Sequence, residues 1–144
     1  MHEMLEVILK LVLLLGLFYI AWCDYKTKLI DVKWLLIVGA IGVAGILLRN
    51  DVIMLGKALL GMLPGFCLLM TAWISEESIG YGDGWLFVMT GIFLGCLQNA
   101  ILLLGSMILA GIFAITCLVL KKKRRNDRVA LAPFVLTAYV LFVL

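Results

Sequence analysis

The sequence is poor in charged side chains, and this shortage excludes several classes of protein. Only 15% of the 144 residues are Asp, Glu, Lys or Arg, whereas 65% are hydrophobic and the mean hydropathy is +1.20. A water-soluble domain has about a quarter of its residues charged, because its surface must be hydrated. The net charge of +3 is also too small to favour nucleic acid as a partner. The composition excludes a soluble enzyme, a nucleic-acid-binding domain and a disordered chain, and indicates an integral membrane protein.

Two patterns are also missing. The four cysteines form no CxxC pair, so a zinc knuckle is not expected, and we predict neither a metal nor a cofactor. Apolar and polar residues do not alternate as they would in the strands of a membrane β-barrel. Unbroken apolar runs predict helices instead. Because a spanning helix needs about 20 apolar residues, the chain has room for about six spans. The sequence therefore predicts an all-α, polytopic membrane bundle that forms a single domain over residues 1–144.

The polar segments divide this bundle into six expected spans, at about residues 4–23, 34–48, 52–74, 85–97, 100–120 and 129–144. The Pro64-Gly65 pair predicts a kink in the third span. Gln98 and Asn99 are the polar break that we expect between the fourth and fifth spans. With 13 residues the fourth span rises only about 20 Å, less than the roughly 30 Å hydrocarbon core, which would recess Asp83 below one membrane surface.

The basic residues predict the orientation of these spans. Nine of the twelve lie in the first and fifth loops, including the run from Lys121 to Arg128. The positive-inside rule places these loops in the cytoplasm, with both termini outside the cell membrane. The same run is a candidate contact for anionic lipid headgroups, although topology alone explains its charge. The N-terminus has no basic leader or small-residue cleavage site, so we expect the first helix to be retained.

Two aspartates are the candidate chemical groups. Asp24 follows the first span and Asp83 precedes the fourth, so this topology puts both at the cytoplasmic edge. Carboxylates near hydrocarbon are costly and therefore mark functional candidates. A close pair shares one proton, which provides an acid and a base that can activate water and protonate a leaving amide. From the helix dipoles we predict that Asp24 holds the proton and Asp83 is the base. The simpler alternatives are that both aspartates only cap helices, or that Asp31 takes the place of Asp24.

The residues around these aspartates resemble known motifs. Gly80-Tyr81-Gly82-Asp83 matches the GxGD signature of intramembrane-type aspartyl proteases, and Gly84 adds a third glycine that allows close backbone approach. The segment from Asp24 to Asp31 resembles the first-aspartate motif of type IV prepilin peptidases. Ala132-Pro133-Phe134 resembles the Pro-Phe motif of that family's last helix. The three matches occur in order and extend over nearly the whole chain.

The resemblance implies a six-helix aspartic endopeptidase that cuts the leader of prepilins or pseudopilins at the cytoplasmic membrane face. Its partner would be the substrate's hydrophobic helix, which follows a basic leader. Asp24 and Asp83 would be the catalytic pair. The residues expected to shape the site or bind substrate are Lys26, Ile30, Gly80, Tyr81, Gly82, Gly84 and Pro133.

The chain departs from the family pattern in three ways. Trp85 stands where the family often has lysine, and Asp31 rather than proline follows Ile30. The N-terminal methylating domain of the long members, with its paired CxxC motifs, does not precede the first span, so we expect a short peptidase without methyltransferase activity. Two other functions stay open: a small proton-coupled transporter or channel subunit, and a non-catalytic scaffold for pilus assembly.

Overall fold

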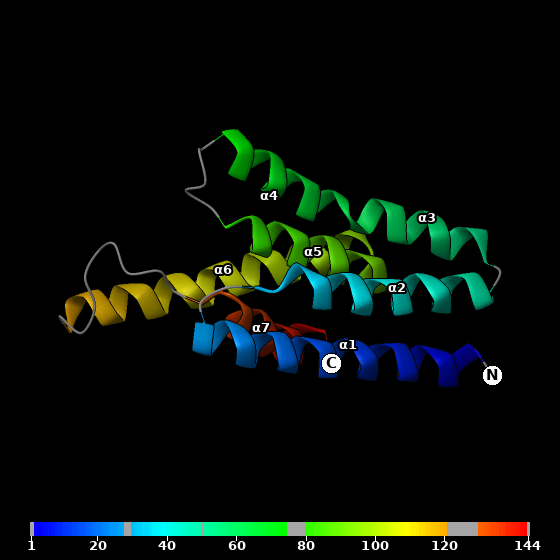
Figure 1. Ribbon diagram of the computed structural model, residues 1–144, viewed down its shortest axis with the longest axis horizontal. Coiled ribbons are helices and arrows are strands. Elements are labelled where there is room, and N and C mark those ends of the chain that lie inside the picture. The colour runs from blue at the N-terminus through cyan, green and yellow to red at the C-terminus, as the bar shows by residue number, and fades with distance from the viewer. Residues whose placement is uncertain (1, 28–29, 50, 75–79, 121–129, 144) are drawn as a thin grey trace.

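The computed structural model describes residues 2–27, 30–49, 51–74, 80–120 and 130–143. These residues form an all-α bundle with no strand (Figure 1), which confirms the predicted fold class. Its helices are α1 (His2–Thr27), α2 (Val32–Arg49), α3 (Val52–Gly61), α4 (Leu63–Ile74), α5 (Tyr81–Leu94), α6 (Cys96–Val119) and α7 (Ala132–Phe142).

Helices α3 and α4 are two parts of one apolar span, Val52–Ile74. The chain is interrupted at Met62, two residues before Pro64. Proline has no N–H, so it cannot bond to the carbonyl of the residue four positions earlier, and its ring crowds that carbonyl. The predicted kink at Pro64-Gly65 is therefore confirmed. Of the other helices, α1 and α6 are also long and apolar enough to cross a membrane, whereas α2 and α7 are shorter apolar helices.

The predicted boundary between the fourth and fifth spans is wrong. The chain turns at Gly95, whose φ of 78° lies in the left-handed region that glycine favours. Gln98 and Asn99 lie inside α6 instead, and the Asn99 side chain is fully buried. A polar residue in an apolar span does not have to face water, because neighbouring helices can supply its hydrogen bonds. Helix α5 also begins at Tyr81, four residues before the predicted start.

Asn99 forms the polar centre of the bundle. Its Nδ2 donates to the carbonyl oxygens of Gly61 and Phe87, both at 2.8 Å, and its Oδ1 accepts from the Thr90 hydroxyl at 2.7 Å. One side chain of α6 therefore joins the end of α3 to the middle of α5. Among the described residues, every buried side-chain nitrogen or oxygen has a hydrogen-bond partner, as a structure inside lipid requires.

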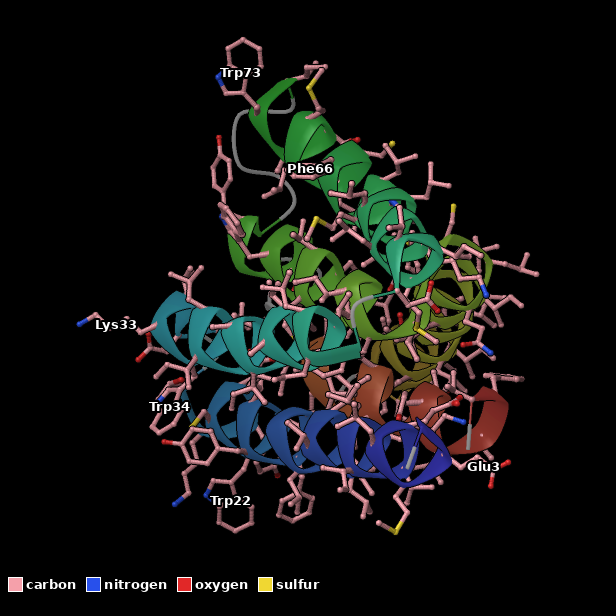
Figure 2. The ribbon with its side chains drawn as sticks, turned by 90° about the vertical axis from the view of Figure 1, so that its right-hand side faces the viewer. Glu3, Trp22, Lys33, Trp34, Phe66 and Trp73 are labelled. Atoms are coloured by element: carbon pink, nitrogen blue, oxygen red, sulfur yellow. The ribbon has the colours of Figure 1, made fainter. Side chains whose placement is uncertain are left out.

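Helix α5 lies at the centre of the bundle. Its residues from Leu86 to Ile92 are all buried, and it packs against α2, α3, α4 and α6. The main apolar core contains Phe87 of α5 together with side chains of α1, α2, α6 and α7, among them Leu13, Leu17, Leu35, Leu102, Val135 and Tyr139. The outer faces of the surrounding helices carry many exposed large apolar side chains (Figure 2), which is the surface that lipid covers.

The helices run in alternating directions along the bundle, with α3 and α4 continuing in one direction (Figure 1). As a result the end of α1, the start of α5 and the start of α7 lie at the same end, on the left in Figure 1, whereas the N-terminus lies at the other. We call the end of the bundle opposite the N-terminus the aspartate end, because Asp24 and Asp83 both lie there. The fold thus brings together the three segments that carry the sequence motifs.

Candidate functional site

Asp24 is buried in the last turn of α1. The prediction placed it in a loop after residue 23, but α1 continues to Thr27. Its side chain is only 4% exposed, and its Oδ2 accepts a hydrogen bond of 2.9 Å from the backbone N–H of Ala132. The first N–H groups of a helix have no partner within the helix, so Asp24 supplies a partner for α7. This contact joins residues 108 positions apart and fixes the position of the carboxylate.

Asp31, the competing aspartate, has a different environment. Its side chain is exposed and its Oδ1 accepts a 3.0 Å hydrogen bond from the backbone N–H of Lys33. This is an ordinary cap at the start of α2. The environments of the two residues therefore favour Asp24 over Asp31 as the functional candidate.

Asp83 lies in the first turn of α5 and is partly buried. Its backbone N–H donates to the carbonyl of Gly80 at 3.1 Å. Its carboxyl group is close enough to that of Asp24 for the two charges to interact. The structure thus brings together the two aspartates that the sequence analysis selected, from α1 and α5. In the described part of the chain, no group of three or more His, Cys, Asp or Glu residues is placed to hold a metal ion.

The three glycines around Asp83 each make room for a different neighbour. A Cβ on Gly80 would lie 3.3 Å from Oδ2 of Asp83, so the carboxylate lies close to the backbone of Gly80. A Cβ on Gly82 would lie 2.9 Å from Cβ of Ile30, and one on Gly84 would lie 2.6 Å from a methyl of Leu69 in α4. The glycine motif therefore contacts the segment that follows Asp24, through Ile30, and also the α4 helix.

The remaining predicted site residues lie nearer the surface. Tyr81 is exposed at the start of α5, and Pro133 is partly buried in the first turn of α7, next to Ala132. Lys26 is exposed, and its Nζ lies 5.0 Å from the centre of the Trp22 ring. That ring points outward from α1 (Figure 2), so the structure does not bring Lys26 toward the aspartates. The roles of these residues in substrate binding stay predictions.

Sequence reasoning missed two contributors to the site. The backbone N–H of Ala132 contacts Asp24, and Leu69 packs against Gly84. A signal for the first was present, because Pro133 near a helix start marks where unpaired N–H groups occur. No local signal identifies Leu69, since most of its neighbours in α4 are apolar as well.

Exposed aromatic side chains surround the aspartate end. All four tryptophans lie near the helix termini there: Trp22 in α1, Trp34 in α2, Trp73 in α4 and Trp85 in α5. Figure 2 shows Trp22, Trp34 and Trp73 at the outside of the bundle. Tryptophan is enriched where a membrane protein crosses the interface between lipid and water. This distribution supports an interfacial position for the aspartate end.

Comparison with known proteins identified one family. The chain matches the type IV leader peptidase family over residues 11–115, which is more than half of its length. The matched segment contains Asp24, Asp83 and the glycine motif, and ends before α7. In the comparisons with curated proteins and with solved structures, no match was found.

Proposed function

The chain belongs to the type IV leader peptidase family, and we propose that it is an aspartic endopeptidase that removes the leader of type IV prepilins or pseudopilins. The catalytic pair is Asp24 and Asp83. The observation that carries this proposal is the arrangement of two acidic groups from distant segments at one end of the bundle, one of them buried and hydrogen-bonded.

The proposed chemistry needs only the two carboxyl groups and water. Two neighbouring carboxylates resist being ionised together, so one holds a proton while the other is a base. The base takes a proton from water, and the hydroxide so formed attacks the carbonyl carbon of the leader junction. The protonated partner then gives its proton to the leaving nitrogen as the C–N bond breaks. The N–H of Ala132 holds the Asp24 carboxylate in a fixed position during these steps.

The assignment of the shared proton to Asp24 stays a prediction. This prediction rests on the position of Asp24 at the C-terminal end of α1, where the dipole disfavours an anion. The structure adds the first turn of α7, whose N–H group donates to the same carboxylate. Since a helix N-terminus favours an anion, the two helix ends act in opposite directions on Asp24.

The proposed substrate is a basic leader followed by an apolar helix. Such a chain places its apolar helix in lipid and its leader in water, so the junction between them lies at the interface. The tryptophans of the aspartate end support the presence of Asp24 and Asp83 at the same depth. The basic first and fifth loops support a cytoplasmic position for this end in the cell membrane. Most of the fifth loop, residues 121–129, lies outside the described residues, so its contact with anionic lipid stays a prediction.

A cleavage assay tests the proposal. The full chain in liposomes is incubated with a prepilin-like substrate, and wild type is compared with Asp24→Asn and Asp83→Asn. The matched control is Asp31→Asn, because asparagine preserves the cap on α2. We expect cleavage at the leader junction by wild type and Asp31→Asn, and none by the other two variants. If wild type is inert toward several leaders while all variants fold, the peptidase proposal is wrong, and proton flux and partner binding become the assays of choice.

A further inference from the structure

A cavity of about 420 Å³ lies at the end of the bundle opposite the aspartates. Segments of α1, α2 and α3 form its walls, together with the turn at Gly95 between α5 and α6. Most of the lining is apolar and includes Leu9, Leu13, Ile46, Met54, Ile92 and Phe93. A volume of this size is in the range of pockets that hold a small molecule.

Two ammonium groups from different helices also line this cavity. Lys10 comes from α1 and Lys57 from α3, and Glu6 is the acidic residue beside them. Nζ of Lys10 lies 3.8 Å from a carboxylate oxygen of Glu6, with both side chains about half exposed. An exposed pair of this kind is weak, so it does not prevent Lys10 from binding another anion. The two lysines and Glu6 leave the cavity with a net positive charge.

Both lysines lie within apolar helices, and this position indicates what kind of ligand the cavity binds. Lys57 lies in the middle of α3, with Leu55, Leu59 and Leu60 exposed around it. A lysine in a spanning segment is rare and is stabilised by an anionic partner or by water. Here two lysines from separate helices line one cavity whose other walls are apolar. A ligand that matches this surface has a compact anionic group and an apolar chain.

We propose that this cavity binds one anionic phospholipid from the surrounding bilayer. The phosphodiester lies between Lys10 and Lys57, the glycerol backbone occupies the cavity, and the acyl chains leave along its apolar wall into the membrane. Phospholipid is the occupant that the surroundings favour, because the helices that form the cavity carry lipid-facing side chains on their outer surfaces. This site lies at the opposite end of the bundle from the end of α6 at Val119 (Figure 1).

The test measures lipid binding by the purified full chain in neutral detergent, with native mass spectrometry as the readout. Phosphatidylglycerol is titrated against wild type, Lys10→Gln, Lys57→Gln and the control Lys33→Gln. Lys33 is exposed at the start of α2, so its substitution removes the same charge at the aspartate end. Phosphatidylcholine with the same chains tests the need for net negative charge, and inorganic phosphate tests the need for the apolar chain.

We expect one phosphatidylglycerol to bind tightly, with affinity about fivefold weaker in each of the two cavity variants and unchanged in Lys33→Gln. Glu6→Gln removes the competing carboxylate and should strengthen binding, a gain that misfolding cannot imitate. Equal losses in all three lysine variants would show diffuse attraction and overturn the proposal. Equal binding of phosphatidylcholine would overturn it too. If inorganic phosphate binds as well as the lipid and depends on Lys57, the ligand is a soluble anion and the lipid assignment is wrong.

Discussion

The crossing of α3 and α5 provides the sharpest test of the packing. A Cβ added to Gly61 would overlap the carbonyl oxygen of Gly91, and a Cβ added to Gly91 would overlap the carbonyl oxygen of Gly61. The obstacle in both cases is backbone, which cannot rotate away as a side chain can. We therefore predict that Gly61→Ala and Gly91→Ala both force the two helices apart and destabilise the protein.

The size of this effect follows from three contributions. Forcing an extra methyl into a packed interface costs about 1–3 kcal/mol. Separating the helices also stretches the Asn99 hydrogen bonds to the carbonyls of Gly61 and Phe87, each worth about 0.6 kcal/mol in a membrane protein. The better helix propensity of alanine returns about 1 kcal/mol. We expect each variant to lower the free energy of unfolding by about 2 kcal/mol.

Gly56→Ala is the matched control for this prediction. Gly56 lies in the same helix, α3, and beyond its chain neighbours and the backbone of its own helix, no atom of the described residues lies within 4 Å of a Cβ built on it. The control should gain up to about 1 kcal/mol from helix propensity alone. Reversible unfolding in mixed micelles, followed by tryptophan fluorescence, measures all three variants. If Gly61→Ala and Gly91→Ala agree with Gly56→Ala to within about 0.5 kcal/mol, the range of a neutral substitution, the close crossing is wrong.

Three further predictions concern side chains around the centre and the site. Asn99→Leu should lower the free energy of unfolding by about 1–3 kcal/mol, because it leaves buried carbonyls unpaired. Gln98→Leu, on the exposed face of α6, should leave the free energy of unfolding nearly unchanged. Thermal unfolding of both variants in detergent measures the difference. Asp24→Asn should unfold like wild type, while Asp24→Leu should be about 1–3 kcal/mol less stable because the first N–H of α7 loses its acceptor. Gly84→Ala should lower cleavage, because the added Cβ would overlap the Leu69 side chain and lie 3.2 Å from the Leu69 backbone nitrogen in α4, and Leu69→Ala in the same chain should restore part of it. Absence of rescue in that double variant would show that Gly84 acts on something other than the contact with α4.

Much of the bundle was predictable, because the apolar runs and the charged segments that separate them each extend over many residues. Apolar run length predicts helices, and Pro64 predicts the break between α3 and α4, since both effects are local. Polarity predicts a turn at Gln98-Asn99, whereas the chain turns at Gly95, where the positive φ favours glycine. In the structure Asn99 finds its partners on α3 and α5. Partners that lie on other helices cannot be recognised from the local sequence.

In the candidate site, too, the sequence identifies the residues, whereas the contacts between different helices are seen only in the structure. Asp24 and Asp83 were selected because carboxylates are costly near hydrocarbon, and the structure brings them together. Pro133 marks a helix start with unpaired N–H groups, but the sequence does not show that Ala132 donates its N–H to Asp24, because the two residues lie 108 positions apart. Lys26 is selected by its place in a motif, and its side chain lies over the Trp22 ring, so its role in substrate binding stays a prediction.

The three sequence motifs together form one connected set of contacts. Gly82 of the glycine motif packs against Ile30 of the first-aspartate motif, and Asp24 of that motif accepts the N–H of Ala132 at the start of α7. The two substituted positions of the family pattern lie outside these contacts: Asp31 caps α2 at the surface, and Trp85 is 37% exposed. Both substitutions therefore leave the buried contacts around the aspartates intact. The arrangement that positions Asp24 and Asp83 therefore depends on residues that fit the family pattern, and the two substituted positions lie at the surface.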